Sequence, residues 1–331
     1  MELNKTYGED ISLIRSNVFQ NEILLIDGQA RSGKNLIAVL LSTMSRVEKM
    51  RLDSQVDYIA RYYFLGKLSL DAATTALRTV FDEGYYNNLI SRDVNFRLDD
   101  YSGVMKQGKR LKYFLRLFYQ AEDKAVLSAM KSRPIFQEMT HDGLHVAKLY
   151  FHALGSRLKI IHIFRDPVGN IFEQNKRGFG TRIGTDPREF QLTHLYQGLP
   201  VPIMVIGREE EYINANALER LVLIVDVMFR LNLEGFYDLA PCERARILFI
   251  EFEDFVVSPE KYIKRFEEFV GDTFGPQRRR ILKRENCPRI INHAERERRI
   301  NEINSNLSPH FREIFEELIR DFDLKPWLKL Q

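Results

Sequence analysis

The residues from Gly28 to Asn35 are the strongest candidate in this sequence for binding an anion. They read Gly-Gln-Ala-Arg-Ser-Gly-Lys-Asn, which satisfies the pattern G-x-x-x-x-G-K of phosphate-binding loops. In such loops the glycines allow the backbone to approach the anion closely, and the following helix presents the positive end of its dipole. Asn35 stands where a Ser or Thr hydroxyl would hold Mg²⁺ in a nucleoside triphosphatase. We expect a phosphate-type site; a tight turn with a solvated Lys34 is the alternative.

A second candidate anion ligand is Arg165. It follows the apolar segment Leu158–Phe164 and begins an Arg-Asp-Pro turn, in which Asp166 can cap a helix that Pro167 opens. By itself this turn is simply a capped helix start.

His141 and Glu138 are the candidate general bases. Both lie in Gln137–His141 (Gln-Glu-Met-Thr-His), directly after a short apolar segment, Pro134–Gln137. A neutral imidazole can accept a hydroxyl proton near pH 7, and burial can raise the pKa of a carboxyl group towards that range. We therefore take His141 first and Glu138 second, with a structural role for both as the alternative.

These residues all follow short apolar segments that we expect to be strands. The segments are Glu22–Asp27, Pro134–Gln137, Leu158–Phe164 and Arg246–Phe252, and each is followed by a helical pattern. Such an alternation indicates an α/β fold with three layers, a parallel sheet flanked by helices on both faces. Since ligands bind at the carboxyl ends of parallel strands, the four segment ends should converge on one site.

The remaining chain is expected to be mainly helical. Residues 47–133 read as several helices, which we interpret as a helical insertion within a single domain covering residues 1–331; it could cover the substrate or only pack. Residues Glu209 to Gly235 read as one long helix.

Composition narrows the classes of function. The 331 residues include 44% hydrophobic and 29% charged residues, as in ordinary globular proteins, and the net charge is +3. This near-neutral balance argues against nucleic-acid binding. No apolar stretch predicts a membrane span or a signal peptide, so the expected compartment is the cytoplasm. Cys242 and Cys287 cannot form a disulfide framework, and no cluster has zinc-ligand spacing.

Three segments in order resemble the sulfotransferases that use 3′-phosphoadenosine 5′-phosphosulfate. Arg31-Ser32-Gly33 matches the family's 5′-phosphosulfate loop, whereas Lys34 and Asn35 depart from its two hydroxyl residues. Lys159–Gln174 looks like the 3′-phosphate segment, and Ile247–Gly271 is similar to the family's strand, Glu-Asp turn and Pro-opened helix.

The resemblance implies a fold, an activity and a set of roles. The fold would be like that of the P-loop nucleoside triphosphate hydrolases, and the enzyme would move a sulfuryl group to a hydroxyl of a small-molecule or carbohydrate acceptor, with no metal required. Thr140 and His141 match the family's Lys-Thr-His, which carries the catalytic base, and Arg31 would support catalysis through its charge. The expected donor-binding residues are Gly28, Arg31, Ser32, Gly33, Lys34, Asn35 and Arg165.

Two features of the sequence concern the binding of the donor's 3′-phosphate. The family usually places a Ser eight residues after the 3′-phosphate Arg, where this chain has Glu173. The positive charges of Lys176 and Arg177 could offset the charge of Glu173. The stretch Gln277 to Arg299 contains nine Lys or Arg residues, and family members often grip the 3′-phosphate with a basic loop at this point. The stretch could instead be a solvated face or hold an acidic acceptor.

Two other functions stay open. Lys34 completes a Walker-type lysine, which fits an ATP-dependent phosphotransferase. An inactive nucleotide-binding relative that serves as an interaction module is the third reading. Neither the oligomeric state nor the acceptor can be predicted from the sequence.

Overall fold

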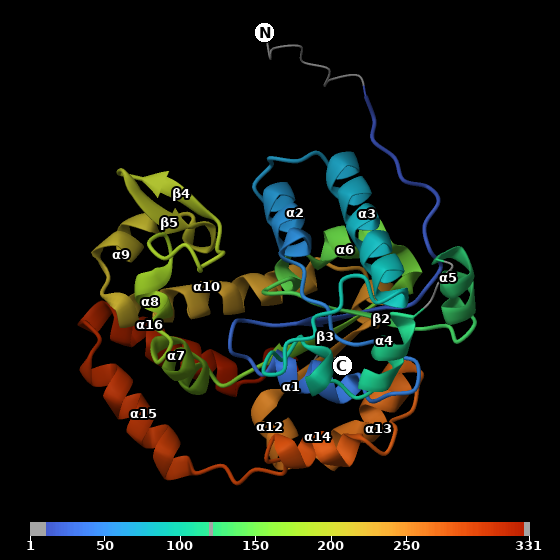
Figure 1. The fold of residues 1–331 in the computed structure, drawn as a ribbon. Helices are drawn as coiled ribbons and strands as arrows, with labels where there is room; N and C mark the ends of the chain where they lie inside the picture. Colours follow the sequence, from blue (N-terminus) through green and yellow to red (C-terminus); the bar gives the residue numbers. More distant parts are fainter. Residues whose placement is uncertain (1–10, 119–121, 328–331) are drawn as a thin grey trace.

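A parallel sheet of four strands forms the centre of the molecule. The computed structural model describes residues 11–118 and 122–327. The strands lie in the order β2-β1-β3-β6 (Figure 1), with bounds β1 (Ile23–Asp27), β2 (Phe136–Met139), β3 (Leu158–Phe164) and β6 (Ile247–Glu251). Parallel pairing brings the carboxyl ends of all four strands to one edge. The predicted α/β class, a parallel sheet flanked by helices, is confirmed.

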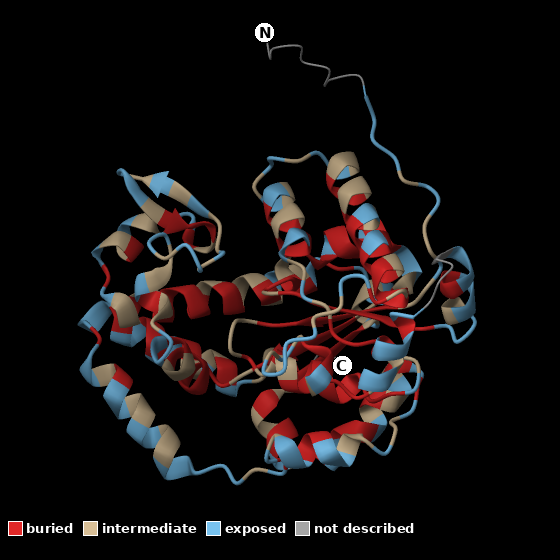
Figure 2. Cartoon of the chain, viewed as in Figure 1, coloured by how far each residue is buried: buried red, intermediate tan, exposed pale blue. Residues whose placement is uncertain are grey.

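Apolar side chains alternate between the two faces of the sheet. Ile23 and Leu25 belong to one buried core, whereas Leu24 and Ile26 belong to the other. The period of two is that of a strand with both faces covered. Figure 2 shows this buried centre, with exposed residues on the outer sides of the helices.

Helices cover both faces and form the three layers. The first core includes residues of α3 (Leu70–Leu89), α6 (Ala147–Leu154), α7 (Pro167–Asn175), α10 (Ala217–Tyr237), α15 (His293–Ser305) and α16 (Pro309–Asp323). The second includes residues of α1 (Lys34–Leu41), α12 (Phe252–Val257), α13 (Pro259–Val270) and α14 (Arg278–Arg284). Short 3₁₀ helices are η1 (Val104–Lys106), η2 (Leu144–Val146), η3 (Gly155–Arg157) and η4 (Ile203–Val205).

Residues 47–133 contain helices, as predicted, between α1 and β2. They are α2 (Ser54–Phe64), α3, α4 (Arg110–Arg116) and α5 (Glu122–Met130). The start of the segment runs along the outer side of β2, where the backbone N–H of Arg51 donates to Gln137 O at 3.1 Å. The segment is thereby anchored to the edge of the sheet that carries His141.

The structure corrects two element predictions. The expected long helix from Glu209 to Gly235 is two helices, α9 (Glu209–Asn214) and α10, because Asn216 begins a new helix with a capping box to Glu219. Residues between α8 (Phe179–Arg182) and α9 form an unpredicted hairpin of β4 (Thr193–Tyr196) and β5 (Leu199–Pro202).

The remaining bounded element is α11 (Pro241–Arg244), which precedes β6. Within the described ranges, 11–118 and 122–327, no helix is both long and apolar enough to span a membrane.

Candidate functional site

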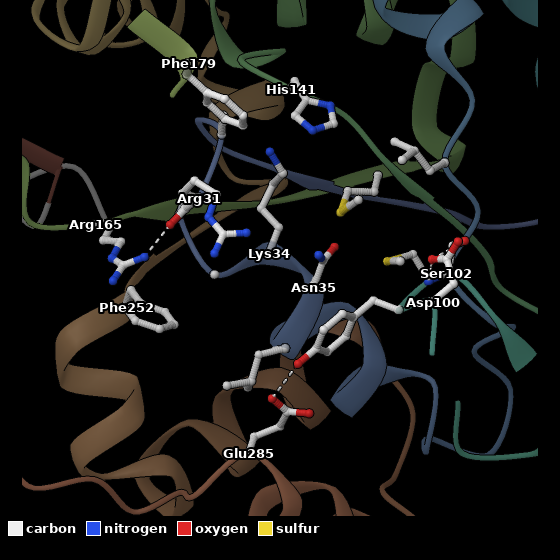
Figure 3. Close-up of a pocket in the computed structure, with 18 of the residues that line it drawn as sticks. Arg31, Lys34, Asn35, Asp100, Ser102, His141, Arg165, Phe179, Phe252 and Glu285 are labelled. Atoms are coloured by element: carbon white, nitrogen blue, oxygen red, sulfur yellow. Dashed lines mark hydrogen bonds between the residues drawn. The ribbon is translucent and has the colours of Figure 1, made fainter. Parts of the chain in front are cut away.

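A cavity of about 400 Å³ lies at the carboxyl ends of the strands. It contains most of the residues singled out in the sequence (Figure 3). The predicted residues among its lining are Arg31, Ser32, Gly33, Lys34, Asn35, His141 and Arg165. Segments more than a hundred residues apart in the sequence thus line the same cavity. Gly28 and Glu138, which were also predicted as site residues, do not line it.

The loop between β1 and α1 has a conformation that requires its two glycines. Gly28 has φ +144°, and a Cβ there would lie 2.6 Å from the carbonyl oxygen of Ile163. Gly33 has φ +95°, and a Cβ would lie 2.2 Å from the ring of Phe252. Both positions therefore exclude side chains by conformation and by contact. Arg31, at the tip, also has a positive φ of 64°.

Lys34 is buried within the loop that precedes its helix. Its Nζ donates to Gly28 O at 2.5 Å and to Gln29 O at 3.1 Å. Burial lowers the pKa of Lys34, and the nearby carboxylates of Asp142 and Asp27 oppose that shift. Figure 3 shows the ammonium group pointing from the loop towards the region of His141.

Arg165 is held beside the loop by three contacts. Its Nη1 donates to Arg31 O at 2.5 Å, its guanidinium lies 4.9 Å from the Phe252 ring centre, and Nε lies 3.8 Å from Glu253 Oε1. Burial lowers its pKa, against the opposing charge of Glu253. Arg289 lies 5.6 Å from the same ring centre and also lines the cavity. The Phe252 ring therefore has two guanidinium groups beside it.

Three polar atoms of the loop region are buried without a hydrogen-bond partner among the described residues. They are Arg31 Nε, Ser32 Oγ and Arg165 Nε. All three can donate a hydrogen bond, and leaving buried donors unpaired costs about 1–3 kcal/mol each. All three residues line the cavity and two of them carry a positive charge, so the site fits the phosphate groups of the sulfuryl donor that the motifs imply.

Glu173 lies on α7 and faces the loop instead of solvent. Its carboxylate is 3.6 Å from the guanidinium of Arg31, and the two side chains are 25% and 35% exposed. Lys176 and Arg177, which were expected to offset it, are exposed and follow the end of α7. The charge of Glu173 is thus partly balanced by Arg31, the residue expected to bind donor.

His141 is oriented by a carboxylate from α2. Its backbone N–H donates to Asp57 Oδ1 at 3.1 Å, and its Nδ1 lies 3.2 Å from Asp57 Oδ2. A carboxylate only accepts hydrogen bonds, so this contact favours the neutral tautomer of His141 that carries its proton on Nδ1 and a lone pair on Nε2. The side chain is 30% exposed and lines the cavity. The sequence contained no local signal for Asp57, because it lies 84 residues from His141.

Glu138 is buried beneath this edge of the sheet. Its side chain is fully buried, accepts from Arg51 Nη1 at 3.2 Å and accepts the backbone N–H of Asp53 at 2.9 Å. Burial raises the pKa of Glu138 to about 7, although Arg51 opposes the shift. The pKa is in the range of a general base, but the carboxylate does not line the cavity.

Asp27, at the end of β1, connects β1 to β3 and to the segment that follows β2, beneath the site. It accepts from Thr140 Oγ1 at 2.9 Å and from the backbone N–H of Gly143 at 2.7 Å, and its Oδ2 lies 2.7 Å from His162 Nδ1. Although burial alone would raise it, the contact with His162 holds the pKa of Asp27 well below its usual value. Thr140 and Asp27 thus fix the backbone from which His141 projects.

The basic stretch near the carboxyl end is divided by the fold. Arg289 joins Arg165 at the cavity, whereas Arg296 binds Asp166 through Nε at 2.9 Å and Nη2 at 3.1 Å. Arg299 packs against the ring of Phe172, 4.3 Å from its centre. Between residues 11 and 118 and between 122 and 327, no group of three His, Cys, Asp or Glu side chains is arranged to hold a metal ion.

Comparison with known proteins gives a structural resemblance and no sequence match. No family model matches the chain, and no curated protein does. The similar solved structures include the sulfotransferase domain from the curacin biosynthetic pathway, at 11% identity and a TM-score of 0.49, covering 92% of this chain and 98% of that one. A second is the sulfotransferase domain from the Synechococcus PCC 7002 olefin synthase, at 13% identity and a TM-score of 0.44, covering 93% and 97%.

A sulfotransferase from Alicyclobacillus acidocaldarius is a third, at 14% identity and a TM-score of 0.39, covering 91% of this chain and 97% of that one. These structures are sulfotransferases, the family that the three sequence motifs resemble. Because their TM-scores are below 0.5, function has to be inferred from the residues of the site.

Proposed function

We propose that this protein transfers a sulfuryl group from 3′-phosphoadenosine 5′-phosphosulfate to the hydroxyl of a small-molecule or carbohydrate acceptor. One observation carries the proposal: the phosphate loop, Arg165 and His141 line one cavity, so anion-binding groups and a proton acceptor face the same space. Asp57 lies behind His141 and contacts its Nδ1. A volume of about 400 Å³ is within the range of cavities that hold nucleotide-sized ligands.

The loop and the arginines would hold the donor. The backbone N–H groups at the start of α1 and the unpaired donor of Ser32 would bind the 5′-phosphosulfate. Arg165 and Arg289 would bind the 3′-phosphate, since both guanidinium groups lie over the Phe252 ring at the edge of the cavity.

His141 would act as the general base. The acceptor oxygen forms a bond to sulfur while the bond from sulfur to the bridging oxygen of the donor breaks, and the hydroxyl proton passes to His141 Nε2. Negative charge collects on the bridging oxygen as adenosine 3′,5′-bisphosphate leaves. Arg31 and Lys34, which line the cavity, would stabilise that charge.

Residues 47–133 would cover part of the site, within one α/β domain. The segment supplies Asp57, which orients His141, and Tyr101 and Ser102, which line the cavity. Arg61 of α2 bridges the backbone of His141 and the side chain of Gln191, at 3.3 and 2.9 Å.

A melting experiment tests the proposal. Adenosine 3′,5′-bisphosphate should raise the melting temperature in the absence of Mg²⁺, and ADP should raise it much less, because only the first places a phosphate at Arg165. Stabilisation by Mg-ATP alone would instead support an ATP-dependent phosphotransferase. Transfer of radiolabelled sulfate from the donor to a mixture of hydroxyl compounds then tests the activity itself.

A further inference from the structure

A second cavity, of about 130 Å³, adjoins the first. The two share Ala30, His141 and Phe179 in their linings. In Figure 3 His141 and Phe179 lie on the same side of the phosphate loop. A ligand in the second cavity would therefore reach the proposed base from a space that Arg165 does not line.

The wall opposite His141 is apolar. It is formed by Phe179 and Ile183 at α8, Met204 of η4, and Ile224 and Met228 of α10. The size is informative, since an apolar protein cavity of about 150 Å³ binds benzene. A single six-membered ring with little substitution would fill the space.

The charged groups in the lining restrict the ligand further. They are the carboxylates of Asp142 and Glu189 and the side chain of His141; no Lys or Arg lines the cavity within the part of the chain that the structure describes. Asp142 is 5% exposed, and its Oδ1 has no hydrogen-bond partner among the described residues. Lys34 and Arg61 lie near Asp142 but outside the lining. Burial raises the pKa of both Asp142 and Glu189. A ligand that can hydrogen-bond to Asp142 is therefore favoured, and a negative charge on the ligand would face two acidic groups.

We infer that the second cavity is the acceptor site, and that it takes a small hydroxyl-bearing compound with one apolar ring and no negative charge. The inference rests on the proposed function and narrows its acceptor from any hydroxyl compound to this class. The lining also includes the amides of Gln29, Gln174 and Gln191, each of which already makes a hydrogen bond within the protein. Simple sugars would place their remaining hydroxyl groups against Phe179, Ile224 and Met228, which offer no hydrogen-bond partner, and acidic sugars would add repulsion from Glu189.

The test measures binding without turnover, by saturation-transfer NMR and calorimetry on the full chain saturated with adenosine 3′,5′-bisphosphate. The probes are phenol, 4-hydroxybenzoate and methyl β-glucoside. Phenol should bind, and 4-hydroxybenzoate and the glucoside should each bind at least about tenfold more weakly. Equal or tighter binding of either one, or no binding of phenol, would overturn the inference.

Variants locate the binding. Met228→Phe should fill the cavity and reduce phenol affinity at least about tenfold, while Leu233→Phe, on the same helix but outside the lining, should not. Glu189→Gln should raise the affinity for 4-hydroxybenzoate relative to phenol, whereas exposed Glu316→Gln should leave the ratio unchanged. If Met228→Phe misfolds, the Glu189 pair still decides, since an unchanged ratio there contradicts the inference.

The two proposals fail in different ways. If adenosine 3′,5′-bisphosphate does not bind, but phenol binds and Met228→Phe weakens that binding, the donor assignment is wrong and the assignment of the second cavity stands. If the donor is used but an anionic acceptor or a sugar is preferred, the cavity assignment is wrong and the transfer reaction stands.

Discussion

Two buried groups of charged side chains differ in how completely they are paired. In the first, which we call the Glu48 cluster, the fully buried Glu48 accepts from Lys112 at 2.5 Å, Tyr113 at 2.6 Å and Arg116 at 3.0 Å. Asn88 Nδ2 adds a fourth contact at 3.2 Å. In the second group, around the phosphate loop, Arg31 Nε, Ser32 Oγ and Arg165 Nε lack hydrogen-bond partners among the described residues.

The difference separates stability from binding. The partners of Glu48 hold the pKa of its carboxyl group at about 2, although burial alone would raise it, so the cluster is charged and satisfied at neutral pH. The phosphate-loop group keeps its donors unpaired at an energetic cost and can recover that cost from an anion. Removing one member of the first group should destabilise the fold, whereas removing one of the second should weaken binding.

The largest expected effect is on catalysis at the open group. His141→Ala should lower the turnover of sulfuryl transfer by about 10²–10⁴-fold, because the acceptor hydroxyl loses its proton acceptor. Turnover is measured at saturating donor and acceptor, and calorimetry should give unchanged affinity for adenosine 3′,5′-bisphosphate. Wild-type turnover in this variant would eliminate His141 as the base.

Next in size is a break in the closed group. Glu48→Gln should lower the free energy of unfolding by about 3–5 kcal/mol at pH 7, since Arg116 and Lys112 lose the charge that compensates them. Urea unfolding measures the change, and Glu316→Gln on an exposed helix face serves as the control. A loss below about 1 kcal/mol would mean that the cluster is not the stabilising element we describe.

The difference in unfolding free energy between wild type and Glu48→Gln should depend on pH, with a sign that follows from the pKa of Glu48. The pKa of Glu48 is lowered in the folded state, so its contribution is present above the unfolded value near 4.5 and is lost as the pH falls towards 2. The stability difference between wild type and Glu48→Gln should therefore shrink over that window. Urea unfolding at pH 7, 5 and 3.5 checks this, and a difference that grows towards low pH would contradict it.

A change at Arg165 should do the opposite of a change at Glu48. Arg165→Met keeps the side-chain stem over Phe252 but removes the charge, and it should weaken binding of adenosine 3′,5′-bisphosphate by about 10- to 100-fold. The melting temperature without ligand should fall little, because a buried charge with an unpaired donor is removed. Unchanged affinity together with a large loss of stability would erase the distinction between the two groups.

The smallest expected effect is at Asp57. Asp57→Asn should lower turnover about tenfold, because a charge-assisted hydrogen bond to His141 becomes a neutral one. Nitrogen-15 NMR of the labelled histidine reports whether the proton leaves Nδ1. Wild-type turnover in this variant, with the proton still on Nδ1, would show that the charge of Asp57 plays no part in orienting His141.

The parts of the fold predicted correctly are those in which local sequence and tertiary environment agree. β1 and β3 are almost uniformly apolar and are buried on both faces, and their predicted bounds differ from the observed ones by at most one residue. β2 begins and ends two residues later than the predicted segment Pro134–Gln137, so it includes Glu138 as well as Gln137. Both are fully buried but hydrogen-bonded, to Ala38 O and to Arg51, and such pairing is invisible in a hydropathy pattern.

The phosphate loop, the strands beside it and the residues at the ends of those strands can be predicted from the sequence. The conformation of a glycine turn and the burial of an apolar strand depend mainly on residues that are close in the sequence, so a local pattern is enough to predict them. Tertiary structure alone decided that Asp57 orients His141, that Glu138 is sealed away from the cavity, and that Glu173 lies against Arg31. Burial and the position of a charge depend on segments up to 142 residues apart, as for Arg31 and Glu173, and no local pattern carries that information.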